Sequence, residues 1–295
     1  MKKHAYLITA YENRYQLEQL LSLLDHEKND IYLQTDSKGT LSVDNLTLHK
    51  SALYILPPFP IYWGAFSMIQ AELNLLKAAA ERRYHYYHMI TNADLPLVSQ
   101  DVIHEYLENS DLEYVSFLPE EKPWAHYKAA YYHFFLDSKL YLKYVFVRGL
   151  RYILVKLQSV CGIDRSKRSH EDFYTGSTYF SITHSLVEYI LAQQSWIKNT
   201  FHHALACDEV FLQTLIMKSP FKNKLSGSDS GKTQNLRYID WIRYKKNSPY
   251  TFKMSDYDEL KEASKKAFFA RKFHRSIDSA IVDSIVEKIK NKMAL

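Results

Sequence analysis

Acidic and aromatic side chains stand at the ends of apolar segments in the first third of the chain. Asp36 and Asp94 lie at or just after two of these segments, and Trp63 follows a third. A carboxylate can hold a hydroxyl or accept its proton, and an indole ring can stack on a sugar or a base. If the segments are parallel strands, these side chains meet beyond the carboxyl edge of the sheet, where such sheets bind ligands. The residues therefore indicate a binding site, although Asp36 could simply end a turn and Asp94 could cap one.

The sequence lacks residue groups with the spacing of a metal site. Its one Asp-x-Asp motif, Asp256-Tyr257-Asp258, opens a predicted helix, where carboxylates favour the helix dipole. The only cysteines, Cys161 and Cys207, do not form a Cys-x-x-Cys pair, and the 13 histidines are scattered. Dinucleotide-type Gly-x-Gly-x-x-Gly, P-loop and Gly-x-Ser-x-Gly motifs are also missing, which disfavours the common dehydrogenase, NTPase and hydrolase classes. We expect no metal and no bound cofactor.

Alternating strands and helices must position these residues. Apolar, aromatic-rich runs predict strands, and Leu or Ala at helical spacing predicts helices. The first 120 residues give strands at 5–11, 30–36, 53–57, 84–91 and 113–118, with helices at 14–25, 66–83 and 99–109. Pro57-Pro58 is expected to close the third strand, and Ser99 to cap the third helix. This alternation predicts an α/β fold, a mostly parallel sheet with helices on both faces.

The second part of the chain is richer in helix. Helices are predicted at 125–160, 184–194, 208–218, 255–270 and 276–292, with strands within 169–183 and at 236–241. Ser255 is expected to cap the helix that begins there, and residues 226–235 read as a flexible loop. No linker separates two independent units, so we expect a single domain over residues 1–295 with helical additions.

Composition and charge exclude several classes of protein. With 46% hydrophobic and 24% charged residues among 295, the chain can bury a core and is not intrinsically disordered. Its basic residues are concentrated at 139–168, with eight Lys/Arg and one Asp, and at 261–295, with nine Lys/Arg and four Asp/Glu. Because no nucleic-acid-binding module accompanies these segments, we expect no nucleic-acid partner.

Residues 141–158 combine large apolar side chains with cations and contain no acidic residue. The cations are Lys143, Arg148, Arg151 and Lys156. This pattern is typical of an interfacial helix whose cations reach anionic headgroups, although a core helix with cations at one edge stays open and Gly149 weakens the helix. There is no apolar run of about 18 residues and no signal-peptide core. We expect a bacterial cytoplasmic protein, peripheral to the inner face of the membrane, with an anionic membrane surface as partner.

Six blocks in order carry a resemblance to a known family. They are YWG with SM at 62–68 and ITNADLPL at 90–97, TDSK at 35–38, GSTYFSITHSLVEYIL at 176–191, CDEVFLQTLI at 207–216, LRYIDW at 236–241, and FFARKF at 268–273. Together they resemble the core-2/I-branching β-1,6-N-acetylglucosaminyltransferase family, which also includes peptide O-xylosyltransferases. The resemblance covers about residues 4–275, and it implies a GT-A-type Rossmann-like fold.

The resemblance also implies an inverting mechanism, a UDP-sugar donor and no metal. Glu209 matches the general base, and Lys272 matches the ligand of the donor's pyrophosphate. The family's second basic diphosphate ligand falls near Pro249 or Tyr250, where this sequence departs from the pattern, and Lys253 or Arg271 is the nearest substitute. Asp36, Trp63 and Asp94 fall on the nucleotide-sugar side, and Asp208 and Trp241 on the acceptor side. The resemblance thus implies a nucleotide-binding half at 1–120, an acceptor and catalytic half at 121–275 and a C-terminal helix at 276–295.

Two functions from different classes follow. The first is an inverting glycosyltransferase that moves a sugar, N-acetylglucosamine or alternatively xylose, from a UDP-sugar to a glycan or lipid-linked glycan. The second is a non-catalytic, membrane-associated protein that binds a glycan or nucleotide on the same fold. Ordinary structural roles also stay open, because Glu209 could favour a helix dipole, Lys272 could be solvated and Trp241 could belong to the core.

Overall fold

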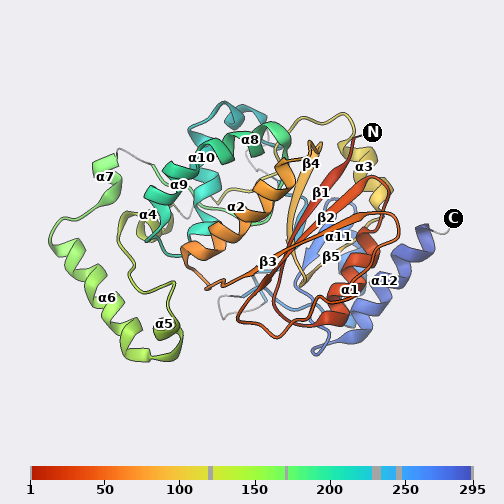
Figure 1. The fold of residues 1–295 in the computed structure, drawn as a ribbon, viewed down its shortest axis with the longest axis horizontal. Helices are drawn as coiled ribbons and strands as arrows, with labels where there is room; N and C mark the ends of the chain where they lie inside the picture. Colours follow the sequence, from red (N-terminus) through yellow and green to blue (C-terminus); the bar gives the residue numbers. More distant parts are fainter. Residues whose placement is uncertain (1, 119–121, 170–171, 228–233, 244–247, 294–295) are drawn as a thin grey trace.

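The computed structural model describes residues 2–118, 122–169, 172–227, 234–243 and 248–293. At its centre is a five-stranded sheet in the order β3-β2-β1-β4-β6 (Figure 1). The parallel strands are β1 (His4–Ala10), β2 (Asn29–Asp36), β3 (Ala52–Phe59) and β4 (Tyr86–Thr91), and β6 (Ser181–Thr183) joins β4 antiparallel. The predicted α/β fold with a mostly parallel sheet is confirmed and is consistent with the GT-A type.

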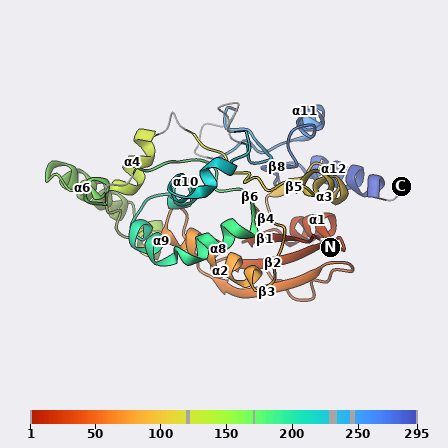
Figure 2. The same cartoon turned by 90° about the horizontal axis from the view of Figure 1, so that it is seen from above.

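Successive residues of β1 point to opposite faces of the sheet, so each face has its own core. Ala5 and Leu7 pack in one core with α2 and α8, whereas Tyr6 and Ile8 pack in the other with α1, α3 and α12 (Figure 2). These helices are α1 (Arg14–Leu24), α2 (Phe66–Ala80), α3 (Gln100–Leu107), α8 (His184–Ala192) and α12 (Ser279–Met293). The prediction of helices on both faces is confirmed.

A three-stranded sheet in the order β5-β8-β7 lies next to the carboxyl end of β4. Its strands are β5 (Asp94–Pro96), β7 (Arg237–Ile239) and β8 (Phe269–Arg271). The predicted helix over 255–270 is wrong at both ends: a 3-10 turn, η5 (Met254–Asp256), precedes α11 (Tyr257–Ala263), and 269–271 form a strand. Phe269 is fully buried, so pairing with β5 and core packing outweigh local helical propensity there.

Several other predicted boundaries change. The third strand continues past Pro57-Pro58 to residue 59, because β3 is an edge strand with a neighbour on one side only, where a missing N–H is tolerated. The predicted strand at 113–118 makes only isolated bridges to residues 225, 181 and 176. Ser99 precedes α3 as expected, but its hydroxyl makes no capping bond. Asp256, rather than Ser255, holds the start of the later helix, since its carboxylate accepts the Lys253 N–H at 2.8 Å.

The predicted helix over 125–160 is interrupted. It consists of α4 (Lys122–Ala130), α5 (Lys139–Lys143) and α6 (Val145–Val160), and Phe135 in the 131–138 connection takes the left-handed φ of 72°. The other elements of this helical region are α7 (Arg165–Ser169), α9 (Gln194–Phe201), η2 (Cys207–Glu209), α10 (Phe211–Met217) and η3 (Pro220–Lys224). None of the helices in the described residues has the length and apolar character needed to span a membrane.

The early and late parts of the chain share their sheets and their core. β6 extends the main sheet beside β4, β8 pairs with β5, and α12 packs against α1. Most of the loop expected at 226–235, residues 228–233, lies outside the described residues. The described structure therefore brings residues near position 90 next to residues near 180 and 270.

Candidate functional site

The acidic pair Asp208-Glu209 lies in η2, and backbone hydrogen bonds to two distant segments hold this turn in place. The Ala206 N–H donates to the Gly64 carbonyl at 2.8 Å, and the Gly176 N–H donates to the Glu209 carbonyl at 2.9 Å. Gly64 and Ala206 both have left-handed φ values, 73° and 43°. The Tyr62-Trp63-Gly64 segment and the 176–191 block, both singled out in the sequence, thus meet at the turn of residues 206–209.

Glu209 forms an ion pair with Lys128 of α4. The Lys128 side chain is only 4% exposed, whereas that of Glu209 is 37% exposed. The Lys128 carbonyl also accepts the Leu205 N–H at 2.9 Å, which ties α4 to the turn that leads into η2. The lysine therefore holds one carboxylate oxygen from the protein side and leaves Glu209 open to solvent. Our sequence analysis missed Lys128, since a single lysine in an aromatic segment has no distinctive spacing.

Asp208 has the opposite environment, because its side chain is buried. The Thr178 hydroxyl donates to Oδ2 at 2.8 Å, while Oδ1 has no hydrogen-bond partner among the described residues. Burial and the neighbouring charge of Glu209 raise the pKa of Asp208 to about 7. Glu72 of α2, also buried, acts on Asp208 electrostatically, and burial with this neighbour raises its own pKa well above the usual range. The site thus contains one accessible and two buried carboxyl groups.

Asp94 and Arg271 form a second charged centre where β5 meets β8. Arg271 Nη1 lies 3.2 Å from Asp94 Oδ2 and 3.2 Å from the Thr91 hydroxyl. The Thr91 N–H also donates to Asp94, so the carboxylate holds the β4–β5 turn as well as the arginine. Although burial opposes it, the charge of Asp94 raises the pKa of Arg271. Both predicted residues are therefore brought together, and both are engaged with protein groups.

Tyr179 connects the two centres. The Arg271 guanidinium lies 4.1 Å from the centre of the Tyr179 ring. Burial raises the pKa of the Tyr179 phenol, and the charges of Asp94, Asp208 and Glu72 raise it further while Arg271 opposes them. Because one phenol experiences all these charges, the Asp94–Arg271 pair and the buried carboxyls lie around the same aromatic residue.

Lys272 and Trp241 lie along neighbouring backbone segments. The Lys272 carbonyl accepts the Phe252 N–H at 2.9 Å, and the Tyr250 N–H donates to the Asp240 carbonyl at 2.8 Å. Lys272 Nζ reaches the Ser248 hydroxyl at 3.2 Å, and burial with the nearby Arg271 charge lowers its pKa. Trp241 is 55% exposed, which argues against the alternative of a core residue. Lys253 follows Phe252 in the chain, and its side chain is exposed.

Asp36 is the last residue of β2, and Trp63 follows the end of β3. Both Asp36 oxygens accept Lys38 Nζ at 2.7 Å, and Oδ1 also accepts the Ile61 N–H at 3.2 Å. Lys38 in turn lies 4.5 Å from the centre of the Tyr62 ring. Trp63 is 65% exposed. Asp36 therefore makes the bonds expected if it simply ends a turn. It also links β2 to the segment that carries Trp63.

Two arginines that the sequence analysis did not select also belong to this region. Arg237 of β7 donates to the Ser181 hydroxyl at 2.6 Å and to the Phe180 carbonyl at 2.7 Å, and burial lowers its pKa to about 10. Arg243 pairs with Asp256 at 2.8 Å and lies 4.2 Å from the Tyr250 ring centre. Arg237 lies in the LRYIDW block, but its partners at 180 and 181 are 57 and 56 residues away, so its contacts could not be read from the sequence.

The Asp-x-Asp motif is accounted for by protein contacts. Asp256 pairs with Arg243 and accepts the Lys253 N–H, so its carboxylate serves the helix start, as the sequence suggested. No group of three or more His, Cys, Asp or Glu side chains within the described ranges could hold a metal ion.

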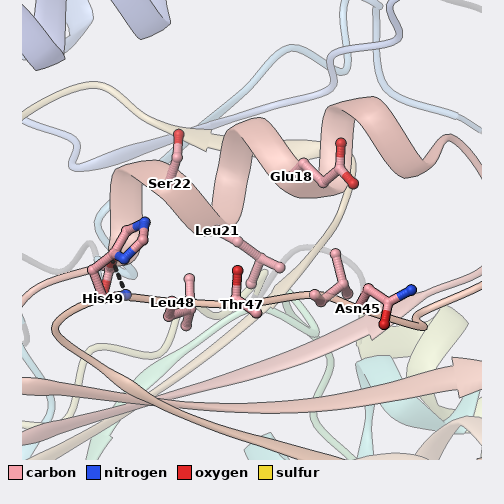
Figure 3. Close-up of a pocket in the computed structure, with 9 residues that line it drawn as sticks. Glu18, Leu21, Ser22, Asn45, Thr47, Leu48 and His49 are labelled. Carbon is pink, nitrogen blue, oxygen red and sulfur yellow. Dashed lines mark hydrogen bonds between the residues drawn. The ribbon is translucent and has the colours of Figure 1, made fainter.

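A separate cavity of about 220 Å³ lies between α1 and residues 45–49 (Figure 3). Glu18 and Ser22 line it from the helix, and Asn45 and Thr47 line it from the opposite segment (Figure 3). Asp25 at its wall is occupied by three backbone N–H groups, of residues 49, 50 and 51, each at 2.8 Å. None of the candidate site residues lines this cavity, so it is a groove of the α1 face.

Comparison with known proteins bears on what these residues can do. The Core-2/I-Branching enzyme family matches residues 4–263 of the chain. This chain belongs to the Core-2/I-branching enzyme family. The family indicates a glycosyltransferase, and the match includes the Asp208-Glu209 pair. It ends before the 268–273 block that contains Lys272.

The curated relatives of this chain are distant in sequence. Xylosyltransferase 2 of Rattus norvegicus is 22% identical over 296 residues, which cover 91% of this chain and 31% of that protein. Xylosyltransferase 2 of Canis lupus familiaris is 28% identical over 122 residues, which cover 37% of this chain and 14% of that protein. The chain spans about a third of the length of the rat protein.

Proposed function

We propose that this protein is an inverting glycosyltransferase that transfers a sugar from a UDP-sugar to a hydroxyl of a glycan acceptor. The observation that carries the proposal is the accessible Glu209 carboxylate, held by Lys128 beside the buried Asp208, inside the part of the chain that matches the family. A general base must reach the attacking hydroxyl, and only the exposed member of the acidic pair can do so without unfolding the turn.

The proposed reaction is a single displacement. Glu209 accepts the proton of the acceptor hydroxyl as its oxygen forms a bond to the anomeric carbon and the bond from that carbon to UDP breaks. Negative charge then develops on the departing diphosphate, and a cation placed there stabilises the transition state. Lys272 is our candidate for this cation, with Lys253 as a second, while Arg271 is already engaged with Asp94. Asp36, Asp94 and Trp63 remain our candidates for the nucleotide-sugar side.

We propose that no metal takes part. Asp256, in the one Asp-x-Asp motif, is engaged with Arg243, and Lys272 supplies positive charge where other transferases use a cation–carboxylate site. For the donor sugar we propose N-acetylglucosamine. Xylose is the alternative, and it is favoured by the distant relatives, which are xylosyltransferases by name. Exposed Trp241 and the turn of Asp208 are our candidates for the acceptor side, where a glycan or lipid-linked glycan would bind.

The test is turnover of UDP-N-acetylglucosamine and UDP-xylose, with and without EDTA, measured as release of UDP. We expect one donor to be hydrolysed slowly without acceptor and the rate to survive chelation. Lys272→Ala should weaken UDP affinity itself, because a cation on the diphosphate acts in the ground state as well as the transition state. Lys261→Ala, at an exposed position of α11, is the matched control. Activity lost to EDTA and restored by manganese would contradict the metal-independent mechanism.

A non-catalytic binding protein on the same fold is the second candidate. The polar contacts of Asp94 with Arg271 and of Asp36 with Lys38 would serve binding as well as catalysis. The same donor panel separates the two functions, because a binding protein would be stabilised by UDP or a UDP-sugar without releasing UDP.

A further inference from the structure

The α5–α6 region has an exposed apolar surface that the proposed reaction does not use. Along α6 the side chains of Phe146, Leu150, Ile153, Leu157 and Val160 are 42–86% exposed. Their spacing of four and three residues places them along one stripe of the helix. Leu140 and Leu142 of α5 are also more than half exposed. We call these seven side chains the apolar stripe.

The opposite side of α6 is the one that packs on the protein. Val147, Val155 and Gln158 are buried, and Gln158 exchanges hydrogen bonds with the Tyr132 backbone at 2.8 and 2.9 Å. Arg151 belongs to this side, since its guanidinium lies 2.7 Å from His133 Nδ1. One side of α6 therefore packs on the protein, and the apolar stripe is a separate apolar surface on another side of the helix.

Lys156 borders the apolar stripe, whereas Arg148 lies on the flank of the packed side, about 120° round the helix from Val160. Arg148, Lys156 and Lys143 are exposed, and Lys156 Nζ lies 4.8 Å from the Tyr152 ring centre. No acidic residue occurs from 139 to 163. In both views α6 lies at the end of the molecule opposite α12 (Figures 1 and 2). An outward stripe of apolar groups with exposed cations on the same two helices and no acidic residue matches an anionic lipid surface.

We propose that α5 and α6 form an interfacial anchor that lies on an anionic bilayer, with the apolar stripe in the headgroup boundary and Lys143, Arg148 and Lys156 on the lipid phosphates. The stripe also has the spacing of a helix-pairing seam. A second copy of this chain is a poorer occupant, because pairing would bring cation-bearing helices together with no acidic residue on either to offset them. The proposal does not depend on the enzymatic activity.

The test is co-sedimentation of the full chain with vesicles of phosphatidylcholine alone and of phosphatidylcholine mixed equally with phosphatidylglycerol. We expect binding only to the anionic vesicles, and weaker binding as salt rises, because surface attraction is screened. Arg148→Glu with Lys156→Glu should reduce binding on the order of fivefold or more for each cation. Lys50→Glu with Lys222→Glu, at exposed positions elsewhere, makes the same change in net charge and should have little effect.

Ile153→Asp tests the apolar stripe, and Val102→Asp, on the exposed side of α3, is its control. We expect the first to abolish sedimentation and the second to preserve it. Sedimentation equilibrium should give a monomer for both. The proposal is overturned if wild-type protein stays in the supernatant at low salt, if Ile153→Asp sediments like wild type, or if a dimer is found that Ile153→Asp dissociates. UDP release should be equal in all these variants, so loss of the anchor and loss of the proposed activity can be told apart.

Discussion

At the scale of the residue, Glu209 and Asp208 are neighbours in the sequence with opposite surroundings. Glu209 faces solvent beside Lys128, whereas Asp208 is buried against Thr178 and its pKa is raised to about 7. A base must be reachable by the acceptor, which the burial of the Asp208 side chain prevents and the exposure of Glu209 permits. The two residues should therefore respond differently to amide substitution.

We expect Glu209→Gln to retain UDP affinity and to lose transfer on the order of 10²–10⁴-fold, the usual contribution of a general base. Asp208→Asn is the contrasting change: the amide oxygen can still accept from Thr178, so UDP release without acceptor should change little. UDP binding by calorimetry and UDP release under saturating donor measure the two effects. Near-normal turnover of Glu209→Gln together with inactive Asp208→Asn would exchange the two assignments.

At the scale of the element, the turn of Glu209 depends on how closely the 176–191 segment approaches the 113–118 segment. A Cβ atom on Gly176 would lie 1.9 Å from the Ser116 carbonyl oxygen and 2.8 Å from Gln213 Nε2. The same glycine donates its N–H to the Glu209 carbonyl. Glycine is therefore required at this position for close backbone approach rather than for an unusual φ.

We expect Gly176→Ala to lower the free energy of unfolding by several kcal/mol, because backbone rather than a flexible side chain must move. Gly149→Ala is the contrasting change, since a Cβ there meets nothing within 4 Å and the residue is inside α6. It should raise stability by about 0.5–1 kcal/mol through helix propensity. Urea unfolding of both variants measures these effects, and equal stabilities would refute the close-approach argument.

At the scale of the whole molecule, buried titratable groups of opposite kinds shape the pH dependence of stability. Burial lowers the pKa of His104 from 6.5 to about 4, and buried His4 and His88 are shifted in the same direction. Burial also raises the pKa of Glu113 from 4.5 to about 7. Between these values the unfolded chain binds the histidine proton more readily, whereas the folded chain binds the glutamate proton more readily.

Acidification from pH 6.5 to pH 5 should therefore remove stability through His104 and add stability through Glu113, each by about 2 kcal/mol at most. His104→Asn should make stability fall less on acidification, and Glu113→Gln should make it fall more. His49→Asn, at an exposed position, should leave the slope unchanged. The comparison uses urea unfolding at both pH values. Parallel slopes in all four proteins would show that these groups are not buried as described.

The sequence by itself determined the alternation of strands and helices, the two-faced sheet and the blocks that identify the family, because these depend on local periodicity and on residues that are close along the chain. Predicted ends failed where a distant partner decides the outcome: 269–271 became a strand because β5 lies beside it, and Pro57-Pro58 was tolerated because β3 is an edge. Only tertiary structure paired Lys128 with Glu209, 81 residues away, and Arg271 with Asp94, 177 residues away. It likewise turned Arg151 inward while Arg148 stayed exposed, since the packed side of a helix depends on its neighbours and not on its composition.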